Sequence, residues 1–187
     1  MKRVILGGFA AGIVFFIWGA IAHTVLPIGE MGFATLQNED AVLATMRASI
    51  TEPGLYFIPG YDMNREVTDE EKAAWEQKYQ AGPTGLLVYS PDGRDPKMVG
   101  QLVAQLITDI VSALILAFLL SLTALTFGKR VGFALLAGLF AWIAVSMPLW
   151  TWYGFPGAYV IGGLIELAVG WTLAGLVLGA IVKPAAE

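Results

Sequence analysis

The sequence predicts an all-α membrane protein with four transmembrane helices and a small α+β extracytoplasmic cap between helices 1 and 2. Three observations predict this fold class. Of the 187 residues, 57% are hydrophobic and 14% are charged, against roughly 25% charged residues in soluble domains. Four apolar stretches each approach the roughly 20 residues that a helix needs to cross a bilayer core. Lys and Arg gather at alternate ends of these stretches, as they do at the cytoplasmic ends of membrane helices.

The apolar stretches set the boundaries of the expected helices. The first transmembrane helix is expected within residues 1–27, and residues 98–187 hold the other three, at 98–127, 131–150 and 157–182. Helices are expected because a single segment in lipid must satisfy its own backbone hydrogen bonds. Met-Lys-Arg at the start, with Ala20-Ile21-Ala22 further on, also resembles a signal peptide. We interpret the segment as a retained anchor, because its apolar run of about 19 residues exceeds the usual 7–15.

Basic residues orient the four helices in the membrane. Lys2 and Arg3 precede the first stretch, Lys129 and Arg130 fill the expected turn between the second and third, and Lys183 follows the fourth. With four crossings these residues lie on one side, which the positive-inside rule makes cytoplasmic. Both termini are therefore expected inside. The segment 28–97, with twelve acidic and six basic residues, is expected outside.

Segment 28–97 is too long for a plain loop and predicts a small folded cap. Helical spacing of apolar residues predicts a helix over about residues 36–50, and a short strand is expected at 55–58 before Pro59-Gly60. Thr68 and Glu71 form a capping-box pattern for a helix over 69–81, which Gly82 ends. Residues 85–90 predict a second strand. Two short strands are not stable alone, so the cap must pack on the helix ends, on itself through Trp75, or on a partner.

Ionisable residues inside the membrane are the first candidates for function, because burying them is costly. By depth, His23, Asp109 and Glu166 all fall in the outer half of the bundle, and Ser146 is a further neighbour for Glu166. A site shared by these four residues could serve as a proton relay, a cation site or an ion pair between subunits. The alternative, which we favour, is a structural hydrogen bond or His–carboxylate pair that holds the helices together.

Two residue patterns indicate how the helices pack. A polar stripe on the second helix, which should face protein or water rather than lipid, includes Asp109 and four neighbours: Gln101, Gln105, Thr108 and Ser112. The stripe is too short for a complete pore lining, and a helix that projects from the membrane to pack under the cap explains it better.

Small residues four apart let helices approach closely; the pairs are Gly8 with Gly12 and Gly175 with Gly179. The pair Gly128 and Gly132 is more simply a feature of the turn.

Composition and motifs exclude several classes of chemistry. The absence of cysteine excludes disulfides, iron–sulfur clusters and cysteine–zinc sites, and a single histidine excludes a multi-histidine metal centre within one chain. No metal site is predicted. The sequence contains no Gly-x-Ser-x-Gly, His-Glu-x-x-His, P-loop or dinucleotide fingerprint, so an enzyme is less favoured than a non-catalytic protein. A net charge of −4 does not favour nucleic acid binding.

Aromatic residues crowd the outer membrane interface around residues 150–159. We interpret them as an interfacial belt; a stacking surface for a bound lipid, quinone or pigment is the alternative. No cofactor is required by the sequence.

Several segments carry a family resemblance: Trp18-Gly19, the stretch 82–89 (Gly-Pro-Thr-Gly-Leu-Leu-Val-Tyr) and the Gly-rich last helix. In these the chain resembles small uncharacterised bacterial four-helix membrane proteins of unknown function, which implies the bacterial inner (plasma) membrane. The topology is also similar to that of claudin-like proteins. The cysteine pair and Trp-rich motif of the claudin outer loop are missing, which excludes that family.

Two function classes follow. The leading hypothesis is a non-catalytic integral membrane subunit or scaffold of a larger complex, such as an energy-converting one, with membrane lipids and other membrane subunits or a second copy as partners. The alternative is a small transporter, or a lipid-, quinone- or ion-binding membrane protein, that uses His23, Asp109 and Glu166.

Overall fold

The computed structural model describes residues 1–62 and 64–183. The chain divides into two compact units. The helical unit combines residues 1–33 with those from Asp95 onward, and the cap unit is Ala34–Arg94. The expected cap, 28–97, was therefore drawn slightly too wide. Residues 28–33 and 95–97 belong to the helical unit.

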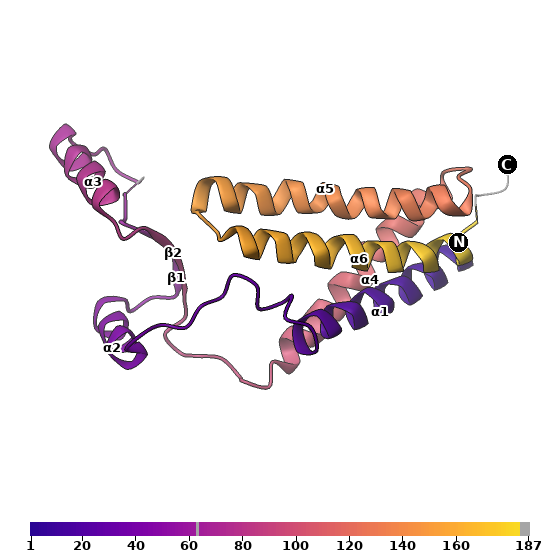
Figure 1. Cartoon of the computed structure of the whole chain (residues 1–187), viewed down its shortest axis with the longest axis horizontal. Helices are drawn as coiled ribbons and strands as arrows, with labels where there is room; N and C mark the ends of the chain where they lie inside the picture. The colour runs from indigo at the N-terminus through magenta and orange to yellow at the C-terminus, as the bar shows by residue number, and fades with distance from the viewer. Residues whose placement is uncertain (63, 184–187) are drawn as a thin grey trace. The chain divides into compact units, whose positions relative to one another are not determined.

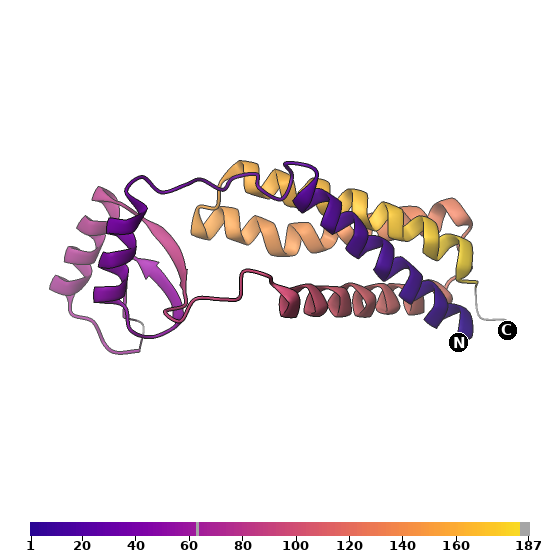
Figure 2. The same ribbon diagram turned by 90° about the horizontal axis from the view of Figure 1, so that it is seen from below.

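Four long apolar helices make up the helical unit: α1 (Lys2–Thr24), α4 (Val99–Ser121), α5 (Phe127–Tyr153) and α6 (Gly157–Ile181). Each is long and apolar enough to cross a membrane. Helix α1 packs on both α4 and α6, and α6 packs on α5, so the neighbours run in the order α4, α1, α6, α5 (Figures 1 and 2). Helix α1 is thus the central connection between α4 and the α5–α6 pair.

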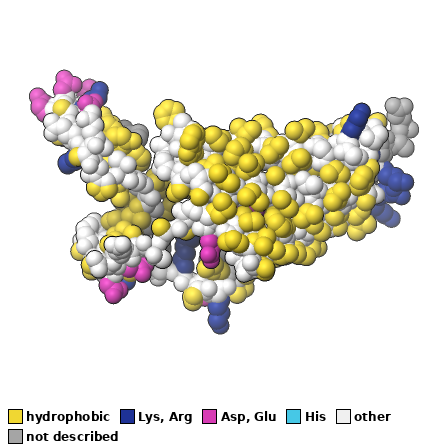
Figure 3. Space-filling model, viewed as in Figure 1, with side chains coloured by type: hydrophobic (Ala, Val, Ile, Leu, Met, Phe, Trp, Pro, Cys, Tyr) yellow, Lys and Arg dark blue, Asp and Glu magenta, His cyan; other side chains and the backbone are white. Residues whose placement is uncertain are grey.

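The outer surface of the helical unit is apolar. One face is covered largely by hydrophobic side chains, and Lys and Arg lie at the end that holds the N-terminus (Figure 3). Large apolar residues such as Phe140 and Ile143 are more than half exposed, a distribution that suits contact with lipid. Four apolar helices with this surface are compatible with a membrane-embedded protein.

Glycines bring the helix backbones into direct contact. A Cβ atom on Gly12 would lie 2.5 Å from the Cα of Ile110, and one on Gly8 would lie 2.8 Å from the Cα of Leu114. On the other side of the unit, a Cβ on Gly175 would lie 2.7 Å from the Cβ of Ala134. The two glycine pairs noted in the sequence therefore lie in helix contacts, whereas a Cβ on Gly128 or Gly132 would meet nothing within 4 Å.

The turn between α4 and α5 differs from the sequence prediction. Helix α4 ends at Ser121 rather than at 127, and α5 begins at Phe127 rather than at 131. The turn is therefore 122–126, and Lys129 and Arg130 lie in the first turn of α5. Arg130 is buried; its Nε donates to the carbonyl of Leu125 at 2.8 Å and its Nη1 donates to the carbonyl of Val182. These bonds connect Arg130 to the α4–α5 turn and to the carbonyl of Val182, the C-cap residue of α6.

The other helix ends differ less from their predicted positions. Helix α1 begins at Lys2, and α5 continues through Pro148 to Tyr153 instead of ending at 150. In the cap, α2 begins at Glu39, three residues later than the sequence pattern indicated.

The cap unit contains α2 (Glu39–Ser49), β1 (Gly54–Ile58), α3 (Asp69–Ala81) and β2 (Gly85–Tyr89). The strands pair antiparallel, with Gly54 opposite Tyr89 and Ile58 opposite Gly85. The predicted capping box is confirmed: the Thr68 side chain accepts from the Glu71 amide at 3.2 Å, and Glu71 accepts from the Thr68 amide at 3.0 Å. Gly82 follows the helix as its C-cap.

Aromatic stacking holds the cap together. Trp75 stacks on Tyr79 at 5.1 Å and meets Tyr61 edge-on at 5.2 Å, and its indole nitrogen donates to the carbonyl of Pro59 at 3.1 Å. Tyr79 also stacks on Phe57 of β1 at 6.2 Å. None of the described cap residues is fully buried, so these rings, rather than an aliphatic core, join the helix to the hairpin. The cap therefore packs on itself through Trp75, one of the three alternatives.

An ion pair reinforces the start of α3. The Arg65 guanidinium donates to both carboxylate oxygens of Glu71, at 2.8 and 3.0 Å. This hydrogen-bonded pairing, together with the Thr68 amide, lowers the pKa of Glu71 from 4.5 to about 2. The same carboxylate raises the pKa of Arg65.

Candidate ligand-binding site

A histidine–carboxylate pair joins α1 and α6. His23 lies in the last turn of α1, and its Nε2 is 3.3 Å from both carboxylate oxygens of Glu166 on α6. Charge-assisted bonds of this kind are usually about 2.7–2.9 Å long, so this contact is long and divided between two acceptors. The His23 side chain is 53% exposed and that of Glu166 is 27% exposed. Glu166 thus keeps acceptor capacity that the histidine does not use.

A cavity of about 270 Å³ opens beside this pair. Ser146 of α5 and Tyr159 of α6 contribute to its wall with His23 and Glu166. The remaining lining residues come from the segment that follows α1 and from the start of α6: Ile28, Gly29, Met31, Phe33, Gly162 and Gly163. Typical pockets for drug-sized ligands are roughly 300–1,000 Å³, so this cavity suits a small molecule or a headgroup.

The segment after α1 folds back over the helix ends and forms one wall of the cavity. The amide of Gly29 donates to the carbonyl of Ala22 at 3.1 Å, and a Cβ on Gly29 would lie only 2.1 Å from Nδ1 of His23. Gly32 has φ +86°, and its Cβ position lies 2.7 Å from the amide nitrogen of Tyr159. Glycine is required at Gly32, because its φ is left-handed and a Cβ would meet the backbone of α6; at Gly29 a Cβ would displace either the segment or the His23 ring.

Two tryptophans fix α6 beside the cavity. The indole nitrogen of Trp18, on α1, donates to the backbone carbonyl of Glu166 at 3.0 Å. From the other side, the indole nitrogen of Trp142, on α5, donates to the carbonyl of Val160 at 2.9 Å. Each carbonyl belongs to α6, so the helix that carries Glu166 is held from both neighbours.

Asp109 does not join the pair. It is buried in α4, and its partner among the described residues is Gln105, whose Nε2 donates to Oδ1 at 2.8 Å. This is a local contact one helical turn apart. The rest of the polar stripe, Gln101, Gln105, Thr108 and Ser112, is exposed in the single chain. The structure therefore brings together His23, Ser146 and Glu166 around the cavity and leaves Asp109 in a separate contact.

Sequence reasoning missed the fold-back segment. Four residues of this segment contribute to the cavity or its wall: Gly29, Met31, Gly32 and Phe33. The sequence Pro-Ile-Gly-Glu-Met-Gly at 27–32 is the signal that could have indicated them. Glycines three apart directly after a proline indicate a tight backbone path. The hydrogen bonds that Trp18 and Trp142 donate to carbonyls of α6 also position the site.

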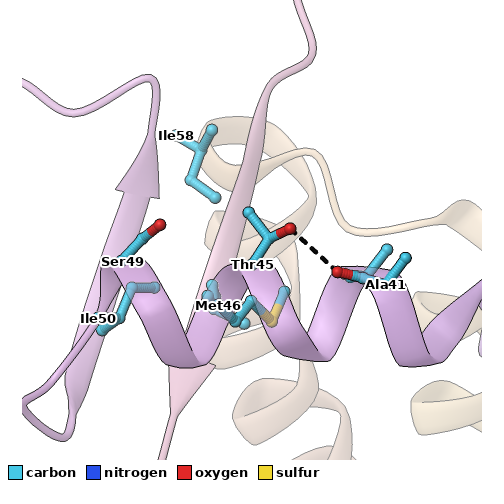
Figure 4. Close-up of a pocket in the computed structure, with 8 residues that line it drawn as sticks. Ala41, Thr45, Met46, Ser49, Ile50 and Ile58 are labelled. Atoms are coloured by element: carbon cyan, nitrogen blue, oxygen red, sulfur yellow. Dashed lines mark hydrogen bonds between the residues drawn. The ribbon is translucent and has the colours of Figure 1, made fainter.

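A second cavity lies in the cap, between α2 and the hairpin. It measures about 460 Å³, and Figure 4 shows Ala41, Thr45, Met46 and Ser49 of α2, with Ile50 after the helix and Ile58 of β1, along it. The Thr45 hydroxyl is used within α2, where it donates to the carbonyl of Ala41 at 2.9 Å. This groove is apolar and carries no ionisable side chain among its described lining, so it offers little chemistry.

The His23–Glu166 pair offers two ligand groups to a cofactor or ion. Within residues 1–62 and 64–183, no three His, Asp or Glu side chains converge as a metal site would require. Comparison with models of protein families, curated protein sequences and solved structures found no match. The fold and the site thus define a class: a protein with four long apolar helices compatible with a membrane, and a small cavity, mostly apolar, beside a histidine–carboxylate pair.

Proposed function

We propose that this chain is an integral membrane protein that binds a small ligand in the cavity beside His23 and Glu166. One observation carries the proposal: a carboxylate on a helix long and apolar enough to cross a membrane opens onto a cavity, and its side-chain partner among the described residues is His23 alone, at 3.3 Å. A purely structural ion pair in an apolar setting is stabilising only when its geometry and hydrogen bonding are excellent. The geometry of His23–Glu166 is poor by that standard, which favours a site whose acceptors remain available.

Both termini are placed in the cytoplasm by this proposal, and the cap lies outside a bacterial plasma membrane. The basic residues Lys2, Arg3, Lys129 and Lys183 support this orientation. Reporter fusions after Lys129 and Lys183 should read cytoplasmic, and an insertion near Glu76 should read external. An external signal at Lys129 would overturn the orientation.

Ligand retention tests the proposed function. After mild detergent extraction, native mass spectrometry should find a small molecule on the wild-type chain that Glu166→Gln loses. Glu76→Gln, which changes an exposed carboxylate of α3, is the matched control and should keep the molecule. Equal small-molecule content in the wild type and Glu166→Gln, with both folded, would contradict the proposal.

A second candidate function is a non-catalytic subunit or scaffold of a larger membrane assembly, and a different observation favours it. The four exposed polar residues of α4, from Gln101 to Ser112, lie on a helix apolar enough to cross a membrane. Polar side chains facing lipid are costly, so a protein partner against this face is expected. Partners of this face would be other membrane subunits or a second copy.

The mass of the extracted particle tests this second function. The wild type should form a particle much heavier than one chain with its detergent, and the double variant Gln101→Leu with Thr108→Val should be lighter. Val103→Leu, on an exposed apolar position of the same helix, should leave the mass unchanged. A wild-type monomer that binds its ligand would exclude the subunit role.

A further inference from the structure

We infer that the ligand of this cavity is an organic ammonium group, either the amine of a lipid headgroup or that of a free small amine. The inference rests on the proposed function and names the chemistry that the site would take. It follows from the charge, the hydrogen-bond capacity and the aromatic rings of the cavity wall.

The charge of the wall excludes anions. Glu166 is the carboxylate of the cavity, and none of its described lining residues is Lys or Arg. His23 is the one lining residue that can become cationic. The acidic and basic side chains of the described wall are thus one carboxylate and one imidazole. A phosphate or carboxylate ligand would face Glu166 with no net positive charge to balance it.

Hydrogen-bond capacity favours a ligand with several donors. A carboxylate can accept about four hydrogen bonds, and among the described residues only His23 Nε2 contacts that of Glu166. The hydroxyl of Ser146 has no partner in the described part of the chain and lies on the same wall. An ammonium group brings donors to these acceptors. A neutral carbonyl ligand such as a quinone needs donors instead. The Ser146 and Tyr159 hydroxyls could donate to it, but the free acceptors of Glu166 would stay unused, and Nε2 of His23 is directed at Glu166.

A bare metal ion fits less well than an organic cation. Calcium takes six to eight oxygen ligands, and magnesium a near-ideal octahedron. The polar side chains of this wall come from four residues, His23, Ser146, Tyr159 and Glu166, and supply fewer oxygen atoms than either ion takes. Aromatic rings suit an organic cation, which binds over ring faces: Phe33 and Tyr159 both line the cavity and meet edge-on, with centroids 5.9 Å apart.

Binding of ethylammonium chloride to the full-length protein tests the inference. In phosphatidylglycerol nanodiscs, ethylammonium should raise the melting temperature in a saturable way, since a ligand that binds only the folded state stabilises it. Sodium chloride at equal ionic strength should not reproduce the effect. Glu166→Gln should weaken ethylammonium binding about tenfold or more, the usual scale for losing a charged hydrogen-bond partner.

Matched variants keep the test decisive. Glu166→Asp retains the charge and should keep part of the binding even if Glu166→Gln is poorly folded. Glu76→Gln should bind as the wild type does. Adding phosphatidylethanolamine to the nanodiscs should weaken apparent ethylammonium binding if the lipid amine occupies the cavity. Unchanged binding would identify a free amine as the source, and both results support an ammonium ligand.

Two outcomes would overturn the inference. If 1-propanol or acetate binds in a Glu166-dependent manner and ethylammonium does not, the ligand class is wrong but the binding function stands. If none of the three probes binds and the wild type retains no small molecule on extraction, the binding function fails as well.

Discussion

Replacing Gly12 by alanine tests the contact on which α1 and α4 depend. The added Cβ would lie 2.5 Å from the Cα and 2.8 Å from the backbone nitrogen of Ile110. Ordinary van der Waals contact begins near 3.4 Å, so the two backbones must separate by roughly 0.9 Å. The clash is with backbone, which cannot rotate away as the end of a side chain can.

The separation costs packing along the whole α1–α4 contact. A gap of 0.5–1 Å removes about a quarter to a half of each atom pair's dispersion energy. The affected cluster contains core residues of both helices, including Ala11, Phe15, Ala113 and Ala117. Overpacking of this kind typically costs about 1–3 kcal/mol. We therefore expect Gly12→Ala to lower the free energy of unfolding by about that amount.

Unfolding of the detergent-solubilised protein by sodium dodecyl sulfate, followed by tryptophan fluorescence, measures this change. Gly132→Ala is the matched control, because a Cβ there would meet nothing within 4 Å. The control should unfold at or slightly above the wild-type detergent fraction. If Gly12→Ala and Gly132→Ala unfold at the same fraction, the close α1–α4 contact is wrong.

The remaining predictions concern the cap, the buried arginine and the tryptophans. Because the pKa of Glu71 is lowered from 4.5 to about 2, its contribution to cap stability should be complete above about pH 4.5 and lost as the pH falls toward 2. Hydrogen exchange of α3 should therefore be faster in Glu71→Gln than in the wild type at pH 6. The difference should vanish near pH 2, and a difference that persists there would refute the assignment. Arg130→Met should lower the free energy of unfolding by about 1.5–3 kcal/mol, because it removes charged donors from buried carbonyls. The control Lys129→Met should change this free energy little. Equal detergent-unfolding midpoints for the two variants would contradict the role of Arg130. Trp142→Phe should cost about 0.5–1.5 kcal/mol through the lost bond to Val160, and Trp152→Phe, on a largely exposed ring, should cost less in the same assay.

Local features of the cap were predictable from sequence because they depend on residues close together in the chain. Thr68 and Glu71 are three residues apart, so a capping box at the start of α3 needs no distant partner. The shared face of Trp75 and Tyr79 follows from their spacing of four, and the structure stacks them. The Gln105–Asp109 bond has the same spacing of four and was equally predictable from the sequence.

The burial of Arg130 could not be predicted from the positive-inside pattern. That pattern counts charges on one side of the membrane and does not distinguish an exposed Lys129 from an Arg130 that binds the end of another helix. Arg130 became a structural residue because α6 ends beside α5, which places the carbonyl of Val182 within its reach. This proximity depends on the packing of two helices and on where the 122–126 turn ends.

The sequence by itself determined which segments are helical and apolar, because backbone hydrogen bonds within a helix and the apolar length needed to cross a bilayer depend on composition and spacing alone. It also predicted that His23 and Glu166 both fall in the outer half of the bundle. Only the tertiary structure decided that they meet, that Asp109 does not join them, and that residues 27–33 fold back to form the wall of a cavity. Those outcomes depend on how far each helix is rotated about its axis and which helices are neighbours. The rotation of each helix and the identity of its neighbours are set by close contacts such as that of Gly12 with Ile110 or Gly32 with Tyr159. These contacts join residues far apart in the chain.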